Sequence, residues 1–536
     1  MRKLIYGVLL AAVGFGAVSA GIHTNKTFLM PRSHNENMAM EYTTWHKTVR
    51  AIDESGDKFG ADIQAVPFYQ KSENDTALGK YFGMYNNANG LTPNVNKTTW
   101  NPYSGNVQDF IWTRNRTDAP GGPTGNLSRH YQALLLDTRF IFHGATAPFL
   151  NVQGLLRPDS ESYGVRLDYH QSLDKVTKGL YLKVTAPIVE VKNNMNIRYT
   201  STSNETTQVV TGVSGTSTLD DYLSGRYENT SAANRQYKLT HAKIAGSDST
   251  SGVADIDVTL GYNFLYREDK HCGVNVCMTI PTGGSPNGDR LFEAVVGNGG
   301  HFGLGVGVDS AFELWKSKSR SLEMLLAANY KYLFDSTEVR TLNIKFSYIA
   351  PALDTYNLSN KIVGHGFYLL GAKVGTTGAF PLANVLTREV GVHPGSMFEG
   401  LASFCLNWGK FSWDLGYNLF AKEGESIMVK NWPNSTYGIP LPGSDVDGAF
   451  NIASSWWGDT GEGLSSHIDD DYINLTNLVA PASPVYVTHK IFTGVGATFD
   501  WKFPVMFGIG GSWEWAQGSN SALDGWALWG KAGISF

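Results

Sequence analysis

The feature that most constrains the fold is a period-two alternation of apolar residues with polar or small residues, repeated along most of the chain. Successive side chains of a β-strand point to opposite faces, so this pattern predicts strands with one apolar and one polar face. The clearest case is 503–515, whose apolar face carries Phe503, Val505, Phe507, Ile509, Trp513 and Trp515. Each alternating segment is about 9 to 13 residues long, the length with which a tilted strand crosses a bilayer.

Counted back from the C-terminus, the alternating segments predict about fourteen strands. They lie near 526–536, 503–515, 489–501, 411–420, 398–408, 364–374, 341–350, 322–334, 301–315, 272–280, 254–266, 180–191, 160–172 and 59–70. A further pair within 71–159 would give about sixteen strands, and either number is even, as in bacterial single-chain barrels.

The connections between the predicted strands alternate between short and long. The turn at 409–410 is short, whereas the regions near 71–159, 192–253 and 421–488 are long and rich in Asn, Ser, Thr and Gly. This arrangement is typical of an outer-membrane barrel with short periplasmic turns and long extracellular loops. We therefore expect residues 59–536 to form an all-β, transmembrane antiparallel β-barrel, because a sheet spans hydrocarbon only when it is closed.

The first twenty residues have the layout of a secretory signal peptide. The basic pair Arg2 and Lys3 precedes an apolar run over 4–18, and small residues then form a cleavage-type site that ends at Ala20. We expect export through the inner membrane and removal of residues 1–20.

Residues 21–58 form an N-terminal segment with the pattern of a short amphipathic helix. Ser33 and Glu36 have capping-box spacing. The apolar stripe that follows, at steps of four and three residues, consists of Met38, Tyr42, Trp45, Val49 and Ile52. Two interpretations remain open: the helix caps the periplasmic end of the barrel, or it enters the lumen as a plug.

The chain ends inside an alternating strand, whose apolar face carries Trp526, Leu528, Ile534 and Phe536. Together with the signal peptide and the alternating strands, this ending resembles Gram-negative outer-membrane β-barrel proteins, in particular general porins and porin-like major outer-membrane proteins. In that family the barrel-assembly machinery reads a terminal aromatic residue. The resemblance therefore implies that these four residues are an assembly signal and that the protein lies among the lipids of the cell outer membrane. It also leaves open a homo-oligomer, since many members are trimers.

The faces opposite the apolar ones carry charged and amide side chains, which are costly in a dry core and favourable around water. The candidate pore-lining residues are Arg166, Asp168, His170, Asp309, Glu313, Asn329, Lys331, Asp414, Asn418, Glu514 and Lys531. For any one of them, an internal ion pair that braces the wall is an equally good interpretation. As a group they predict a wide polar lumen and a channel for passive diffusion of small hydrophilic solutes or ions.

Two other functions stay open at this point. A barrel similar to the long-chain fatty-acid transporters would carry apolar substrates and would use the N-terminal segment as a hatch, and its lumen would be more apolar. A surface adhesin or structural protein of the outer membrane would act through the long loops.

Several further classes are disfavoured. The formal net charge of −5 becomes more negative once Arg2 and Lys3 are removed, which argues against nucleic-acid binding. No G-x-S-x-G, H-E-x-x-H or P-loop sequence occurs, so we expect no enzyme and no cofactor. Five aspartates are a weak candidate for a Ca²⁺ site, and the alternative interpretation is a solvated acidic loop. They are Asp445, Asp447, Asp469, Asp470 and Asp471.

Overall fold

The structure is a computed structural model of the chain, and every structural statement below refers to the residues that it describes. These are 26–44, 60–82, 152–155, 157–201, 219–230, 235–244, 246–267, 269–344, 366–373, 378–438, 472–499, 501–517 and 521–536. The expected signal peptide lies outside this part of the chain.

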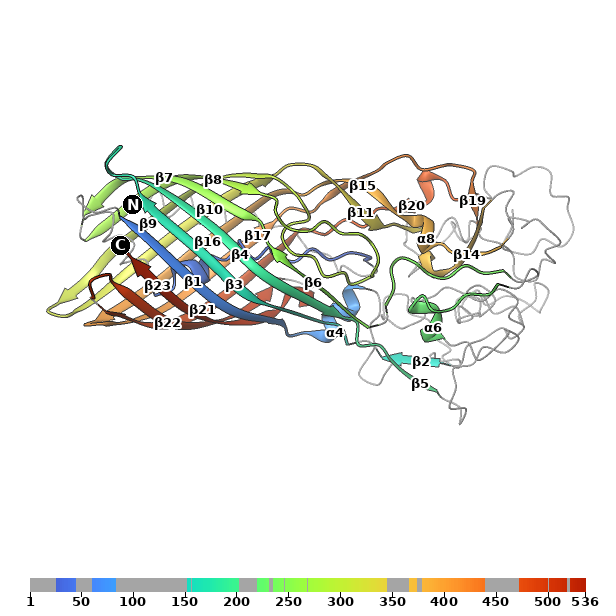
Figure 1. Cartoon of the computed structure of the whole chain (residues 1–536), viewed down its shortest axis with the longest axis horizontal. Coiled ribbons are helices and arrows are strands. Elements are labelled where there is room, and N and C mark those ends of the chain that lie inside the picture. Colours follow the sequence, from blue (N-terminus) through green and yellow to red (C-terminus); the bar gives the residue numbers. More distant parts are fainter. Residues whose placement is uncertain are drawn as a thin grey trace, which may run out of the picture.

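The described residues contain a large antiparallel sheet that closes on itself as a barrel (Figure 1). Of its thirteen strands, β6 pairs only with β4, and the other twelve form the closed ring. These are β1 (Ala61–Ser72), β3 (Asp159–Ser172), β4 (Leu180–Asn194), β7 (Ile256–Arg267), β8 (Lys270–Ile280), β9 (Gly303–Ser317), β10 (Arg320–Leu333), β16 (Gly395–Trp408), β17 (Phe411–Lys422), β21 (Tyr486–Phe499), β22 (Val505–Ala516) and β23 (Gly525–Ser535).

The first and last strands complete the ring. β23 pairs antiparallel with β1, and β1 pairs on its other side with β3. At the end of this seam, the backbone amides of Ala61 and Phe536 each donate to the carbonyl oxygen of the other residue, both at 2.9 Å. The C-terminal residue is thus tied into the sheet. The seam between β1 and β23 therefore leaves no open edge, whose amides and carbonyls would lack hydrogen-bond partners in a bilayer.

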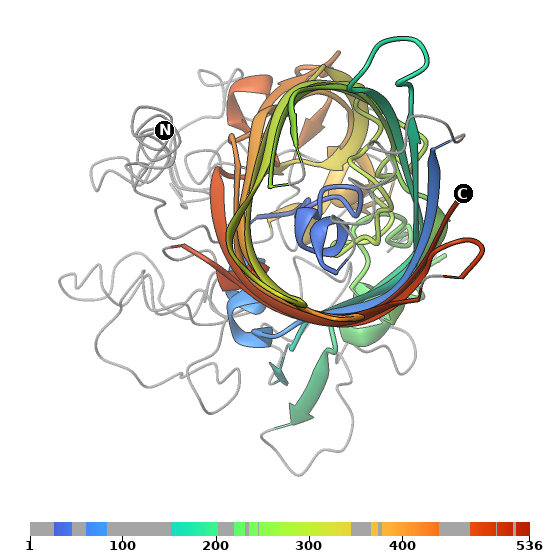
Figure 2. The ribbon, with the colours of Figure 1, turned by 90° about the vertical axis from the view of Figure 1, so that its left-hand side faces the viewer.

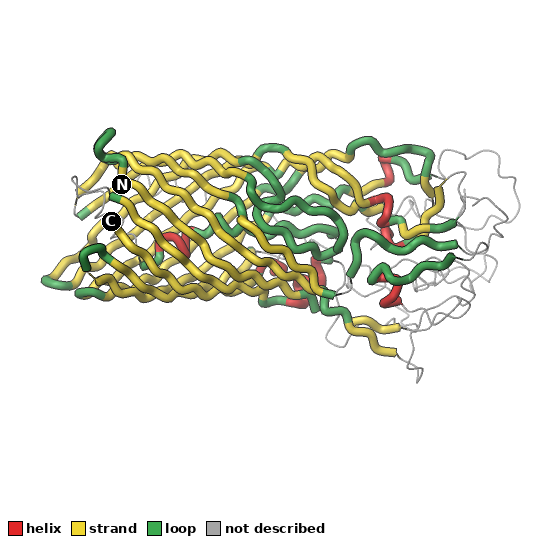
Figure 3. The backbone as a smooth tube through the Cα atoms, viewed as in Figure 1, coloured by secondary structure: helices red, strands yellow, loops and turns green. Residues whose placement is uncertain are grey.

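The two ends of the barrel differ in their connections (Figure 3). At one end, called the short-turn end below, strands are joined by brief turns such as 318–319 and 409–410. At the other, the long-connection end, the chain leaves the barrel for extended excursions such as 195–255 and 423–485. The predicted alternation of short and long connections is confirmed.

The predicted number of strands is wrong, because neither fourteen nor sixteen strands form the described barrel. The segments predicted at 341–350 and 364–374 are not barrel strands: β10 pairs directly with β16, from Arg320 opposite Trp408 to Leu333 opposite Gly395. The described parts of both segments instead pack into a hydrophobic core beyond the barrel, where Leu342, Ile344 and Leu369 are fully buried. Alternation shows that one face of a segment is apolar, but such a face can pack against protein as well as against lipid.

Side chains on the barrel wall follow the predicted alternation. Outward apolar residues are open to the surroundings, with Val306 57% exposed, Ile509 67% and Leu528 58%. Their inward neighbours are buried, as shown by Trp529 at 4% and Lys531 at 3%. A continuous apolar outer face around a closed sheet is the arrangement that a bilayer requires. None of the described helices is long and apolar enough to cross a membrane.

The connections at the long-connection end fold together into a second body, called the cap below. Its shared hydrophobic core includes Tyr222, Tyr368, Leu382, Leu386, Val390, Trp432 and Ile473. Apart from the N-terminal helix described below, the short strands and helices outside the ring, in the cap or beside it, have the following bounds. They are β2 (Val152–Leu155), β5 (Arg198–Ser201), β6 (Ser247–Val253), β11 (Ser336–Thr341), β12 (Asn343–Ile344), β13 (Leu370–Lys373), β14 (Phe380–Pro381), β15 (Thr387–His393), β18 (Ser426–Val429), β19 (Tyr437–Gly438), β20 (Leu478–Val479), α4 (Asp75–Tyr81), α6 (Leu219–Leu223), α8 (Ala383–Leu386), η4 (Gly366–Tyr368), η5 (Leu475–Asn477) and η6 (Ser521–Leu523).

The predicted N-terminal amphipathic helix is largely not observed. The described residues contain only the five-residue helix α2 (Met38–Tyr42), and the predicted continuation over 45–52 lies outside them. Its N-cap is Asn37, whose side chain accepts from the Met40 amide at 3.4 Å, and not the predicted Ser33. The capping box fails because the Ser33 hydroxyl donates to Asp255, just before β7, and Glu36 pairs with Lys331 of the barrel wall. Seen along the barrel, α2 lies in the middle of the lumen (Figure 2).

The outer face gives a direct test of the membrane-spanning architecture. We expect Val306→Arg to lower the free energy of unfolding in lipid vesicles by about 2–4 kcal/mol, because the guanidinium would enter hydrocarbon. Val306→Leu keeps the face apolar and should change it little. Urea titration followed by tryptophan fluorescence measures both variants. Equal stabilities would show that this face does not contact lipid.

Candidate functional site: the barrel lumen

Residues 26–44, called the lumenal segment below, run through the barrel from one end toward the other. At the cap, the Lys26 amide donates to the Tyr81 carbonyl at 3.0 Å, and Thr27 Oγ1 donates to the Thr341 carbonyl at 2.6 Å. Toward the short-turn end, the Thr44 amide donates to Asp414 Oδ2 at 2.9 Å. The segment therefore occupies the lumen lengthwise.

Arg32 binds an acidic part of the wall formed by β16, β17 and β22. Its guanidinium pairs with Glu399 and lies 3.4 Å from Glu514 Oε1, and both of its Nη atoms donate to Asn418 Oδ1 at 3.1 and 3.2 Å. The Phe420 ring lies below, with 4.5 Å between its centroid and the guanidinium carbon. Carboxylates, an amide oxygen and an aromatic face are the groups that guanidinium prefers.

Glu36 binds a different part of the wall. It pairs with Lys331 of β10, whose Nζ also lies 3.0 Å from Asp257 Oδ2 of β7. Lys331 is only 1% exposed. A lysine buried this deeply requires the two carboxylates, because their removal would leave its charge uncompensated.

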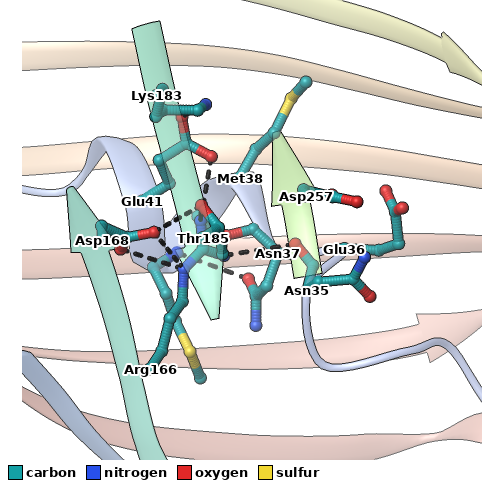
Figure 4. Close-up of polar contacts among 12 residues, drawn as sticks. Asn35, Glu36, Asn37, Met38, Glu41, Arg166, Asp168, Lys183, Thr185 and Asp257 are labelled. Carbon is teal, nitrogen blue, oxygen red and sulfur yellow. Dashed lines mark hydrogen bonds and ion pairs between the residues drawn. The ribbon is translucent and has the colours of Figure 1, made fainter. Parts of the chain in front are cut away.

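Glu41 binds the basic part of the wall formed by β3 and β4 (Figure 4). It pairs with Lys183 and, at 3.0 Å, with Arg166 Nη2. Arg166 is 1% exposed, pairs with Asp168 at 3.0 Å, and donates to the Asn37 carbonyl at 3.1 Å. One wall arginine therefore holds both a side chain and the backbone of the lumenal segment.

Lys531 of β23 closes the end of helix α2. Its Nζ donates to the carbonyl oxygens of Met40 at 3.0 Å, Glu41 at 2.6 Å and Thr43 at 2.9 Å. The last carbonyls of a helix have no partners within the helix and carry partial negative charge. A buried ammonium with three donors satisfies both needs, which fixes α2 against the barrel seam.

Glycines in β21 and β22 allow the segment to approach the wall closely. A Cβ added at Gly494 would lie 2.2 Å from Thr43 Cγ2, and one at Gly496 would lie 2.9 Å from Thr44 Cβ. Any larger residue would displace the segment. The glycines of these alternating strands thus form the surface against which Thr43 and Thr44 pack.

A second set of contacts fixes the start of the segment to the cap. The Arg340 guanidinium carbon lies 3.8 Å from the centroid of the Phe28 ring, and Tyr81 OH donates to the Phe28 carbonyl at 2.8 Å. Arg340 also pairs with Glu338 at 2.7 Å and with Glu425 at 2.5 Å. Burial raises the pKa of Glu425, but Lys422 and Arg340 outweigh it and hold the pKa at about 2.

Two small cavities border the lumenal segment. One of about 40 Å³ lies between Asn35, Glu36 and the wall residues Lys183, Asp257 and Asn329. The other, of about 110 Å³, lies beside Pro31 and is bordered by Lys490 and Glu514. Since one water takes up about 30 Å³, these spaces hold from one to a few water-sized molecules.

The predicted pore-lining residues all belong to the inward face, but most of them contact the lumenal segment or one another. Those bound to the segment are Arg166, Lys331, Asp414, Asn418, Glu514 and Lys531. Asp168 pairs with Arg166, Asp309 lies 2.5 Å from His271, and His170 stacks on Tyr181. Asn329 borders the smaller cavity, and Glu313, near the short-turn end, pairs with Lys316. A role in conduction stays a prediction.

The other predicted sites have simpler outcomes. Leu528, Ile534 and Phe536 face outward, and Trp526 lies against Tyr69 with 5.5 Å between ring centroids, while their role in assembly stays a prediction. The Ca²⁺ candidate residues Asp445, Asp447, Asp469, Asp470 and Asp471 lie outside the described residues. Within the described part of the chain, no group of three or more His, Cys, Asp or Glu side chains is placed to hold a metal ion.

Several residues of the site were missed from the sequence. They are Arg32, Glu36, Glu41, Lys183, Asp257, Glu399 and Lys490. The wall members carry a readable signal, because each is a charge on the polar face of a predicted strand. The members on the lumenal segment carry none, since the sequence does not show whether a charge in or before a short helix points to solvent or to the wall.

A closed antiparallel sheet with an apolar exterior and a charged interior is the architecture of an outer-membrane β-barrel, so the resemblance to porin-like barrels is confirmed at the level of the fold. No protein-family model and no curated protein matches the chain. Among solved structures, it is similar to an outer membrane channel from Pseudomonas putida F1, with 10% identity over 89% of this chain and 95% of that one, and a TM-score of 0.34. It is also similar to the NanC porin, with 8% identity over 70% of this chain and 93% of that one, and a TM-score of 0.24. Both likenesses are distant, and the fold rests on the strand pairing itself.

The glycine contacts predict a specific clash and its relief. Gly494→Ala should lower the free energy of unfolding by about 1–3 kcal/mol, because the added Cβ overlaps the Thr43 methyl group. Thr43→Ser removes that methyl and keeps the hydroxyl that donates to the Ala39 carbonyl. Urea titration should therefore show that the double variant recovers most of the loss. Additive effects of the two changes would contradict this packing.

The cap contacts predict a dependence on acid. Because the folded-state pKa of Glu425 is lowered to about 2, its ionised form stabilises the protein above about pH 4.3, and this stabilisation is lost as the pH falls toward 2. The stability difference between the wild type and Glu425→Gln should shrink by about 2 kcal/mol between pH 5 and pH 2.5. Urea titrations at pH 5 and 2.5 measure it. A difference independent of pH would show that Glu425 is not held ionised.

Proposed function

We propose that the protein is an outer-membrane channel for small hydrophilic solutes or ions, and that the lumenal segment closes it at rest. The observation that supports this best is how the segment is held. Arg32, Glu36 and Glu41 each bind charges of opposite sign on the wall. Beside these ion pairs, Met38 and Met40 of the same segment belong to an apolar cluster with wall residues such as Phe492.

The polar contacts between the lumenal segment and the wall matter because water can replace them when the segment leaves. If the segment leaves an apolar core, the exposed surface is costly to hydrate. If it leaves charged walls, water replaces the lost ion pairs, and the desolvation cost of the buried charges is recovered. The charged part of the lumen is therefore compatible with both a filled and a flooded state, which is the property that a gated aqueous channel needs.

A barrel that carries apolar substrates is the second candidate. One observation favours it: the N-terminal part of the chain lies in the lumen, as a hatch would. The lining opposes it, since Arg166, Lys331 and Lys531 would bind no apolar molecule. An adhesin acting through the cap also remains a candidate, and a protein of that class would not conduct.

Conduction can be tested by fixing the lumenal segment to the wall. A Cβ at position 496 lies 2.9 Å from Thr44 Cβ, so a disulfide between Thr44→Cys and Gly496→Cys needs a shift of less than about 1 Å to reach normal geometry. In planar bilayers, we expect the oxidised double variant to open at least about tenfold less often than the reduced one, because the closed state alone can form the bond.

The two single-cysteine variants, oxidised in the same way, should behave as they do when reduced. Equal conduction by the oxidised and reduced double variants would show that the segment is not the gate. A reduced double variant and a wild type that both never conduct under an applied potential would exclude a channel.

A further inference from the structure

The contacts of Arg32 describe a binding site as well as a closed gate. Four wall groups converge on its guanidinium: the carboxylates of Glu399 and Glu514, the amide oxygen of Asn418 and the ring of Phe420. All four belong to the barrel and none to the lumenal segment. When the segment leaves, these groups stay in place on β16, β17 and β22.

We propose that Glu399, Glu514, Asn418 and Phe420 form a subsite for the guanidinium group of a solute, and that Arg32 occupies this subsite while the channel is closed. The proposal rests on the proposed function, since it names the solute class that the gate would admit. Guanidinium-bearing solutes would compete with Arg32 for the wall and so favour the open state.

The wall charges around Arg32 support a monovalent cation as the occupant. Glu514 is shared with Lys490 at 2.9 Å, and Glu399 has no wall cation as an ion-pair partner among the described residues. Without Arg32, two carboxylates thus face one lysine, and the subsite carries a net negative charge. Glu399 is 3% exposed, so this charge is costly unless a cation replaces Arg32.

The geometry favours guanidinium over a simple ammonium. The two Nη atoms of Arg32 divide between different acceptors: Nη2 binds Glu399, Nη1 lies near Glu514, and both reach Asn418. The planar group lies over the Phe420 ring. An ammonium carries three donors on one atom and cannot bridge acceptors in this planar way.

A cavity adjoins one edge of the subsite. The cavity of about 110 Å³ is bordered by Pro31, which precedes Arg32, and by Glu514 and Lys490. Its border is mixed, with Ser162 and Asn193 beside apolar residues such as Phe292. A small cation in this cavity would lie beside one of the two carboxylates that hold Arg32.

Chemical replacement of the missing side chain tests the subsite. Arg32→Ala should increase channel opening in planar bilayers, and millimolar ethylguanidinium should restore closure by filling the space that the guanidinium leaves. Ethylammonium at the same concentration and ionic strength should act at least about tenfold more weakly. Glu41→Ala is the matched control, because it also removes a segment charge but leaves Arg32 in the subsite.

Binding is measured separately by the shift in thermal unfolding that ethylguanidinium produces in detergent. We expect a shift for Arg32→Ala that is absent for Glu41→Ala and for the double variant Arg32→Ala with Glu399→Gln. Arg32→Lys provides a folded protein if Arg32→Ala does not fold, and it should show a smaller shift of the same kind.

The outcomes separate the two proposals. If ethylguanidinium stabilises Arg32→Ala no more than it stabilises Glu41→Ala, the subsite is refuted, whether or not the protein conducts. If the shift appears as expected but none of the proteins conducts, the subsite stands and the proposed channel function fails. Equal effects of ethylguanidinium and ethylammonium would overturn the preference for guanidinium.

Discussion

The backbone pairing between β1 and β23 is the contact on which the rest of this structure depends. In a bilayer, an amide or carbonyl without a partner costs several kcal/mol, so a spanning sheet must close. Here the closure extends to the last residue, where Ala61 and Phe536 exchange both backbone hydrogen bonds. Once the sheet is closed, its alternation sends most apolar side chains to the lipid and most charged side chains to the interior.

That division creates a problem inside the barrel. Twelve strands enclose a space into which Arg166, Lys331, Glu399 and many other polar side chains point. These charges need water or partners. The lumenal segment supplies partners of opposite sign along its length, with Arg32 on the acidic wall and Glu41 on the basic wall. The wall and the segment therefore stabilise each other. Without the segment, the charged side chains of the wall could still bind water or a charged solute.

Much of the barrel could be predicted from the sequence, because alternation and length directly encode a lipid-facing strand. Twelve of the predicted strands match the twelve in the ring. The error at 341–350 and 364–374 arose because apolar residues that face a protein core and those that face lipid follow the same pattern. Strand number is therefore set by which segments pair, as β10 does with β16, and pairing is a long-range property.

The candidate site was less predictable. The wall residues could be assigned to the lumen from their position in each strand, but their partners could not, since Glu36 and Lys331 are far apart in the sequence. The helix signal of the N-terminal segment was also misleading. Ser33 and Glu36 have capping-box spacing, yet Asp255, next to β7, binds Ser33, and Lys331 of the wall binds Glu36. A helix-capping prediction from sequence spacing fails where a distant residue binds the capping side chain more strongly than the helix backbone does.

The central claim is that residues 32–44 lie inside the barrel at rest. Hydrogen–deuterium exchange of the intact protein in lipid vesicles tests it most directly, by comparing the peptide that covers this segment with peptides from the barrel strands. We expect slow exchange of the segment amides in the wild type, approaching that of β21 and β22, and faster exchange of the segment alone in the Arg32→Ala variant. Fast exchange of the segment in the wild type, as in an unfolded chain, would contradict it.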